Sequence, residues 1–214
     1  MPENTWEIVT AAGALGTAAF GIVEGLKRLA WIGEAGFPTI LRILGRIVDT
    51  LAVAYGPDVE ALLRAQYRGE PKELARVIRQ GARIGLTAEN ASQVAQALGL
   101  IDAPTLAEAA EALNAGGDLR PELRNVLGRF ELAVDARIDA ALTLAQNEYA
   151  SAARLTASVI SVGIALVVGW RMDPTGAQLP MAAVVGFLAV PLAPVAKDLV
   201  TALKSASQAL KARQ

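Results

Sequence analysis

The sequence predicts an all-α integral membrane protein with three transmembrane helices, a cytoplasmic helical bundle, and a long helix continuous with the second span. Three long, uncharged apolar stretches indicate the spans: Ile8–Val23, Leu155–Trp170 and Thr175–Ala196. Each approaches the length that the hydrocarbon core of a bilayer requires once flanking residues are counted. The mean hydropathy is +0.38. With 53% hydrophobic and only 19% charged residues, the chain is more apolar than a typical soluble domain.

The composition also excludes several function classes. The chain has no Cys and no His, which removes disulfides, thiolate catalysis and the commonest general base and metal ligand. Phosphate-binding, dinucleotide-binding, serine-hydrolase and zinc-protease motifs do not occur. Ser158 and Ser161 lie in the second apolar stretch without a base beside them, and we expect them to hydrogen-bond to their own helix or a neighbour. We therefore predict no enzymatic activity, no catalytic residue, no cofactor and no bound metal.

The positive charges predict an orientation in the membrane. Of the 20 Lys and Arg residues, fifteen lie between Lys27 and Arg154, and the loop between the second and third stretches holds only Arg171. By the positive-inside rule, the middle of the chain and the C-terminal tail are cytoplasmic, and the N-terminus is outside. Trp6 and Trp170 would then lie at the outer interface and Trp31 near the inner one. The predicted location is the cytoplasmic, or inner, membrane.

The first transmembrane helix, within residues 1–33, carries a stripe of small residues on one face. The stripe consists of Gly13, Thr17, Gly21 and Gly25. Small residues four apart let helix backbones approach closely in membranes, so the stripe predicts a homo-oligomer contact. The alternative is that a chain rich in Gly and Ala shows such a spacing by chance.

Residues 34–120 are predicted to form a cytoplasmic bundle of short helices separated by Gly and Pro. Within it, residues 39–55 have an apolar face, so this segment is either an interfacial helix on the inner membrane surface or a buried helix of the bundle. Thr105 and Glu108 have the spacing of a capping box that opens a helix ending near Asn114.

Ser92–Asn114 has a weak helix-turn-helix pattern, but its second helix carries Glu108 and Glu111 and no cation. A helix that reads DNA needs basic or polar residues, and the net charge of the chain is -1. We therefore expect no nucleic-acid partner.

Residues 121–171 are predicted to form one long helix running into the second span. No helix breaker interrupts the pattern before Asp173-Pro174. The apolar stripe along it comprises Leu123, Leu127, Phe130, Val134, Ile138, Ala141, Leu142 and Ala145. At 1.5 Å per residue, a helix of about 50 residues would be about 75 Å long.

The C-terminal part is predicted to hold an outer loop and the third span, residues 172–196, followed by a cytoplasmic amphipathic tail helix, residues 197–214. Pro191 and Pro194 either kink the third span or mark its end and the start of the tail helix. The tail carries Lys197, Lys204 and Lys211 along one side. This pattern suits a membrane surface or a helical partner.

Two rows of opposite charge each lie along one face of a predicted helix. The basic row comprises Lys72, Arg76, Arg79 and Arg83, with Arg64 and Arg68 upstream, and the acidic row on the long helix comprises Glu131, Asp135 and Asp139. The rows could be solvated, could meet within or between subunits, or the basic row could contact anionic lipid or an acidic partner. The acidic row is also a weak candidate for a cation pathway or a Mg²⁺ or Ca²⁺ site.

Two functions fit these patterns. The first is an oligomeric membrane scaffold or adaptor, bound to lipid, whose cytoplasmic domain organises a protein partner. The second is a homo-oligomeric pore or ion channel. A pore needs polar residues facing its lumen, and the spans offer only a few Thr and Ser residues and Gln178. The scaffold is therefore the preferred prediction.

Overall fold

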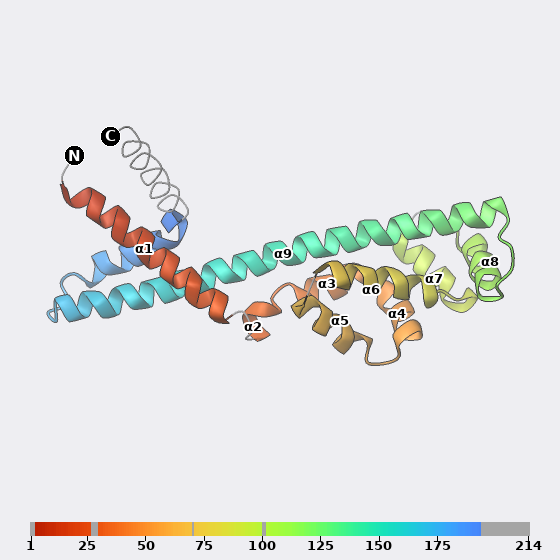
Figure 1. The fold of residues 1–214 in the computed structure, drawn as a ribbon, viewed down its shortest axis with the longest axis horizontal. Coiled ribbons are helices and arrows are strands. Elements are labelled where there is room, and N and C mark those ends of the chain that lie inside the picture. Colours follow the sequence, from red (N-terminus) through yellow and green to blue (C-terminus); the bar gives the residue numbers. More distant parts are fainter. Residues whose placement is uncertain (1–2, 27–29, 70, 100–101, 194–214) are drawn as a thin grey trace, which may run out of the picture. The chain divides into compact units, whose positions relative to one another are not determined.

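The computed structural model describes residues 3–26, 30–69, 71–99 and 102–193, and this part of the chain is helical without strands, as predicted. The tail helix and Pro194 lie outside the described residues. The chain forms two compact units. We call Met1–Ile32 with Ala150–Gln214 the terminal unit, and Gly33–Tyr149 the central unit. One helix, α9 (Pro121–Met172), belongs to both units (Figure 1).

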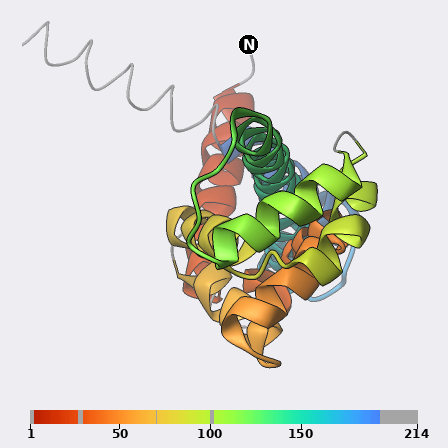
Figure 2. The same ribbon diagram turned by 90° about the vertical axis from the view of Figure 1, so that its right-hand side faces the viewer.

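Short helices of the central unit gather along the first part of α9 (Figures 1 and 2). They are α3 (Phe37–Leu44), α4 (Ile47–Tyr55), α5 (Val59–Arg68), α6 (Pro71–Ile84), α7 (Ala88–Leu98) and α8 (Ala103–Asn114). A single turn, α2 (Ala30–Gly33), precedes them. Together they enclose one continuous apolar core with α9. The predicted stripe on the long helix supplies one side of that core: all its members are buried except Leu142, which is half-buried.

The 52 residues of α9 confirm the predicted long helix. No proline occurs inside it, and Gly128 and Gly163 are accommodated as single residues within the helical ladder. The helix ends at Met172, where Asp173-Pro174 follows.

Residues 39–55 form two helices, which corrects the expectation of a single one. The chain breaks at Gly45, whose φ of 51° lies in the left-handed region that favours glycine. On both sides of the break the apolar side chains, such as Ile40 and Leu51, are fully buried in the core. Of the two alternatives for residues 39–55, this burial favours helices of the bundle over an interfacial helix.

The predicted capping box at Thr105 and Glu108 is wrong. The helix α8 begins two residues earlier, at Ala103, and the Thr105 hydroxyl donates to the Asp102 carboxylate at 3.0 Å. A capping box exists instead at α7, where the side chain of Thr87 and that of Asn90 each accept from the other residue's backbone N–H. The spacing is the usual one, but Asn90 replaces the Glu or Gln that the motif normally has, so a search for the usual residues does not find it.

Two glycines allow backbones of the central unit to touch. A Cβ atom on Gly36 would overlap the carbonyl oxygen of Ala145 on α9. A Cβ atom on Gly85 would overlap the carbonyl oxygen of Thr50 on α4. A larger residue at Gly36 would therefore push the start of α3 away from α9, and one at Gly85 would push the end of α6 away from α4.

Besides the turn α2 up to Ile32, three helices make up the described part of the terminal unit: α1 (Glu3–Leu26), the C-terminal part of α9, and Leu179–Ala193. The predicted first span, Ile8–Val23, falls within α1, whereas Leu179–Ala193 covers only part of the predicted third span, Thr175–Ala196. Among the residues searched, α9 is the one helix long and apolar enough to cross a membrane, and Leu179–Ala193 is shorter. Only 22% of the most apolar window of α9 is buried, whereas the core helix of a soluble protein would be mostly buried. The described residues thus contain one candidate span and not a demonstrated set of three.

Candidate functional site

The exterior of the terminal unit is apolar. On α9, Val159 and Val167 are 65% and 61% exposed, and on the last helix Phe187 is 65% exposed. Of the fifteen exposed large hydrophobic residues among the described side chains, eleven belong to this unit. Exposed apolar surface of this extent marks a membrane or protein contact, because water does not solvate it favourably.

The helices of the terminal unit meet through glycine and alanine. A Cβ atom on Gly16 of α1 would overlap the carbonyl oxygen of Ala189. One on Gly186 would lie 2.7 Å from the Cα atom of Val162 on α9. Such close backbone packing through small residues is typical of helix association in membranes, where packing rather than water exclusion holds helices together.

Hydroxyl groups in this unit mostly bond to their own helices. Thr156 donates to the carbonyl of Ala152 at 2.8 Å, and Ser158 donates to that of Arg154 at 3.0 Å, as expected for Ser158. This back-bonding satisfies a hydroxyl without a polar neighbour. Ser161 is different, because its hydroxyl is buried and has no hydrogen-bond partner in the described part of the chain.

The predicted oligomer stripe of α1 faces mainly outward. Gly13 is buried, whereas Thr17, Gly21 and Gly25 are exposed. The space over Gly21 and Gly25 is open. The close contact of α1 inside the chain uses Gly16, which the four-residue spacing did not single out. Gly16 lies on a different face of α1 from Gly21 and Gly25, so the outward face remains available for contact with a second copy of the chain.

The two charged rows meet within one chain, which was one of the predicted alternatives. Arg79 Nε lies 2.6 Å from Asp135 Oδ1, and Arg83 Nε lies 3.5 Å from Glu131 Oε1. These pairs join α6 to α9. All four side chains are at least one-third exposed, so each pair contributes at most about 1 kcal/mol.

The remaining members of the rows do not take part in this contact. Arg76 pairs locally with Glu73 at 2.6 Å, and neither Lys72 nor Asp139 has an ion pair in the described part of the chain. The described residues also hold no group of three acidic side chains placed to bind a metal ion. Within the acidic row, Glu131 and Asp135 therefore pair with α6, and Asp139 does not.

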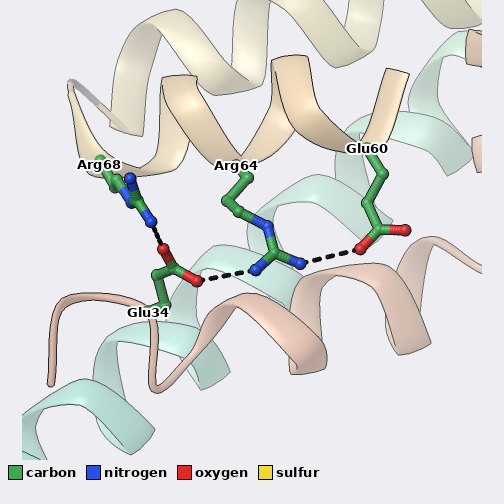
Figure 3. A network of polar contacts seen from close by, with 4 residues as sticks. All are labelled: Glu34, Glu60, Arg64 and Arg68. Atoms are coloured by element: carbon green, nitrogen blue, oxygen red, sulfur yellow. Dashed lines mark hydrogen bonds and ion pairs between the residues drawn. The ribbon is translucent and has the colours of Figure 1, made fainter. Parts of the chain in front are cut away.

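Arg64 and Arg68 do not extend the basic row, because they lie on α5 and face Glu34 (Figure 3). Arg64 Nη1 lies 2.9 Å from Glu34 Oε2, and its Nη2 lies 3.0 Å from Glu60 Oε1. Arg68 pairs with the second oxygen of Glu34. The Glu34 side chain is only 13% exposed, so two cations compensate one nearly buried carboxylate. Arg64 also lies over the ring of Phe37.

Sequence reasoning missed Arg137, which ties α9 to two other helices. Its guanidinium donates to the carbonyl of Ile43 at 3.2 Å and to that of Ala97 at 2.8 Å. Both carbonyls lie in the last turns of α3 and α7, where they have no partner within the helix. A cation at a helix C-terminus is also favoured by the helix dipole. The signal was an arginine at the edge of the apolar stripe, next to Ile138.

A second unpredicted contact lies on the same side of α9, about three turns further along the helix. The buried Thr39 hydroxyl of α3 lies 2.7 Å from both carboxylate oxygens of Glu148 and can donate to either. Arg42 lies beside them, with its Nη2 atom 3.9 Å from Glu148. These groups hold α3 against α9 near the end of the central unit.

Two side chains have shifted acidities. Burial raises the pKa of Tyr67, a hydrogen bond with the Gly36 backbone partly opposes the rise, and the charge of Glu148 adds to it. Hydrogen bonds from the Thr175 side chain and backbone lower the pKa of Asp173 in the loop after α9. Tyr67 is therefore a neutral packing residue against Phe37, and Asp173 is an ionised residue that shapes the loop.

Comparison of the chain with protein-family models, curated proteins and solved structures finds no match. The assignment of function therefore depends on the surfaces described above.

Replacing Arg137 by Met should destabilise the central unit. The change keeps most of the apolar stem but leaves the carbonyls of Ile43 and Ala97 without their donor, which costs about 1–3 kcal/mol. The measurement is the free energy of unfolding of the full chain in mild detergent, together with amide hydrogen exchange in α3 and α7. The matched control is Arg129→Met, because Arg129 is exposed on the same helix. Equal stability and equal exchange in the two variants would contradict the assignment.

Proposed function

We propose that the protein is an oligomeric integral membrane scaffold, without catalytic activity, whose cytoplasmic unit organises a protein partner. One observation carries the proposal: the terminal unit is apolar on its exterior, whereas the central unit has its own core and a surface of paired charges. The first kind of surface suits lipid, and the second suits water. In this proposal α9 crosses the bilayer, and α1 and the Leu179–Ala193 region form two further crossings.

The proposed orientation follows the distribution of Lys and Arg. The central unit carries most of the cations, so it is placed in the cytoplasm, and the loop around Thr175 is placed outside. The partner would meet the central unit, where Lys72 is exposed and unpaired in the described part of the chain. Lys72 is the first residue of the basic row, and in this proposal it contacts anionic lipid or an acidic partner.

A homo-oligomeric pore is the alternative, and it receives less support. The described helices of the terminal unit contact one another through small apolar residues, and Thr156 and Ser158 bond to their own helix. Few polar groups are therefore free to line a lumen. A pore would have to form between copies of the chain.

Single cysteines test the proposed orientation, since the natural chain has none. Ala88→Cys should be protected from a membrane-impermeant maleimide in intact cells, and Thr175→Cys should react. Both positions are suitable because Ala88 is exposed in the central unit and Thr175 is exposed in the loop after α9. After the membrane is permeabilised, both should react. Labelling of Ala88→Cys from outside would contradict the orientation.

Replacing Gly21 by Leu should disrupt the proposed oligomer. The site is exposed with open space around it, so the larger side chain fits within one chain but blocks close approach of a second helix. Native mass spectrometry should show a shift to smaller assemblies. Gly163→Leu on α9 is the matched control, because Gly163 is equally open but lies off the stripe. An unchanged assembly in Gly21→Leu would remove this face from the proposal, and ion conductance in reconstituted bilayers would favour the pore.

A further inference from the structure

The terminal unit contains an apolar hollow of about 330 Å³ between its three helices. Ala11 and Leu15 of α1 line it on one side, and Ala165 and Gly169 of α9 line it on another. Met181 contributes from the last helix. The small side chains at Ala11, Ala165 and Gly169 leave the space unfilled.

The hollow is open to the apolar exterior of the unit. Val168, Met172 and Met181 line it and are 51%, 77% and 66% exposed. Gln178 is the one polar side chain among its lining residues. Water needs about two to four polar partners to occupy such a site, so water is a poor occupant. The hollow therefore suits an apolar occupant that enters from the apolar exterior of the terminal unit.

We propose that this hollow binds one acyl chain of a phospholipid. The inference rests on the proposed membrane location of the terminal unit, because a hollow that opens into a bilayer is adjacent to lipid chains. An acyl chain would restore the dispersion contacts that the lining side chains otherwise lack. The flexible Met172 and Met181 side chains can adapt to its shape.

A cation next in sequence to a lining residue fits a lipid with an anionic headgroup. Arg171 precedes the lining residue Met172, is exposed, and has no ion pair in the described part of the chain. The nearby Asp173 carboxylate is engaged by Thr175, which donates its backbone N–H at 3.0 Å and its hydroxyl at 2.5 Å. Arg171 is thus available to a phosphate, with Gln178 as a second donor.

Filling the hollow should displace the lipid. Ala11→Phe places a ring in it, and Ala18→Phe is the matched control, because Ala18 is also exposed on α1 but does not line the hollow. The full chain, extracted in mild detergent with its native lipid, is examined by native mass spectrometry. The natural chain and Ala18→Phe should retain one phospholipid per chain, and Ala11→Phe should lose it. Equal retention in both variants, or no retained phospholipid in the natural chain, would overturn the inference.

A second measurement does not depend on the variants. A phospholipid with a diazirine in its acyl chain is incorporated with the natural chain into bilayers and photolysed. Cross-links should concentrate on Met172 and Met181 and be fewer at Val159, which is equally apolar but outside the hollow. Even labelling of all three residues would overturn the inference. If alkaline carbonate extracts the chain from membranes, the proposed function itself fails. Stable insertion without a retained or localised lipid rejects only the binding site.

Discussion

A single helix that must satisfy two environments is the constraint on which the rest of the structure depends. In its first part, α9 buries one stripe, from Leu123 to Ala145, and its other faces are mainly polar, with Leu132 and Leu144 as exposed apolar exceptions. In its last part, side chains such as Leu155 and Val159 are apolar and exposed. The same backbone hydrogen bonds run through both parts, so the change of environment is encoded by side chains alone. Each unit is then built from helices that complement its part of α9.

Different interactions stabilise the inside of each unit. In the central unit, a burial-driven core is supplemented by polar contacts to α9, of which Arg137 satisfies two helix ends at once. In the terminal unit, Gly16 and Gly186 bring backbones into contact, and the hydroxyls of Thr156 and Ser158 turn back to their own helix. This division agrees with a central unit that folds in water and a terminal unit that packs in lipid, as proposed.

Patterns that repeat along one helix could be predicted from the sequence, whereas contacts between segments far apart in the sequence could not. The lack of a helix breaker before Asp173-Pro174 predicted the length of α9, and its apolar stripe predicted the buried face, because the helical repeat fixes which residues share a side. The meeting of Arg79 with Asp135 could be offered only as one alternative, since nothing local determines which helix packs on which. Arg137 and Glu34 were missed because their partners lie on other helices. The capping box was misplaced because Thr105 fits the motif, although the N-cap of the helix is Asp102.

Spin labels at four exposed apolar positions test the central claim, that the terminal unit lies in lipid and the central unit in water. Val159 and Phe187 represent the first, and Val53 and Leu132 the second, and all four side chains are at least 59% exposed. Each is replaced by Cys, labelled with a nitroxide and reconstituted in bilayers. The account predicts that apolar oxygen relaxes the labels at Val159 and Phe187 more than a water-soluble nickel chelate does, and that the order reverses at Val53 and Leu132. Stronger relaxation by nickel at all four positions would contradict it.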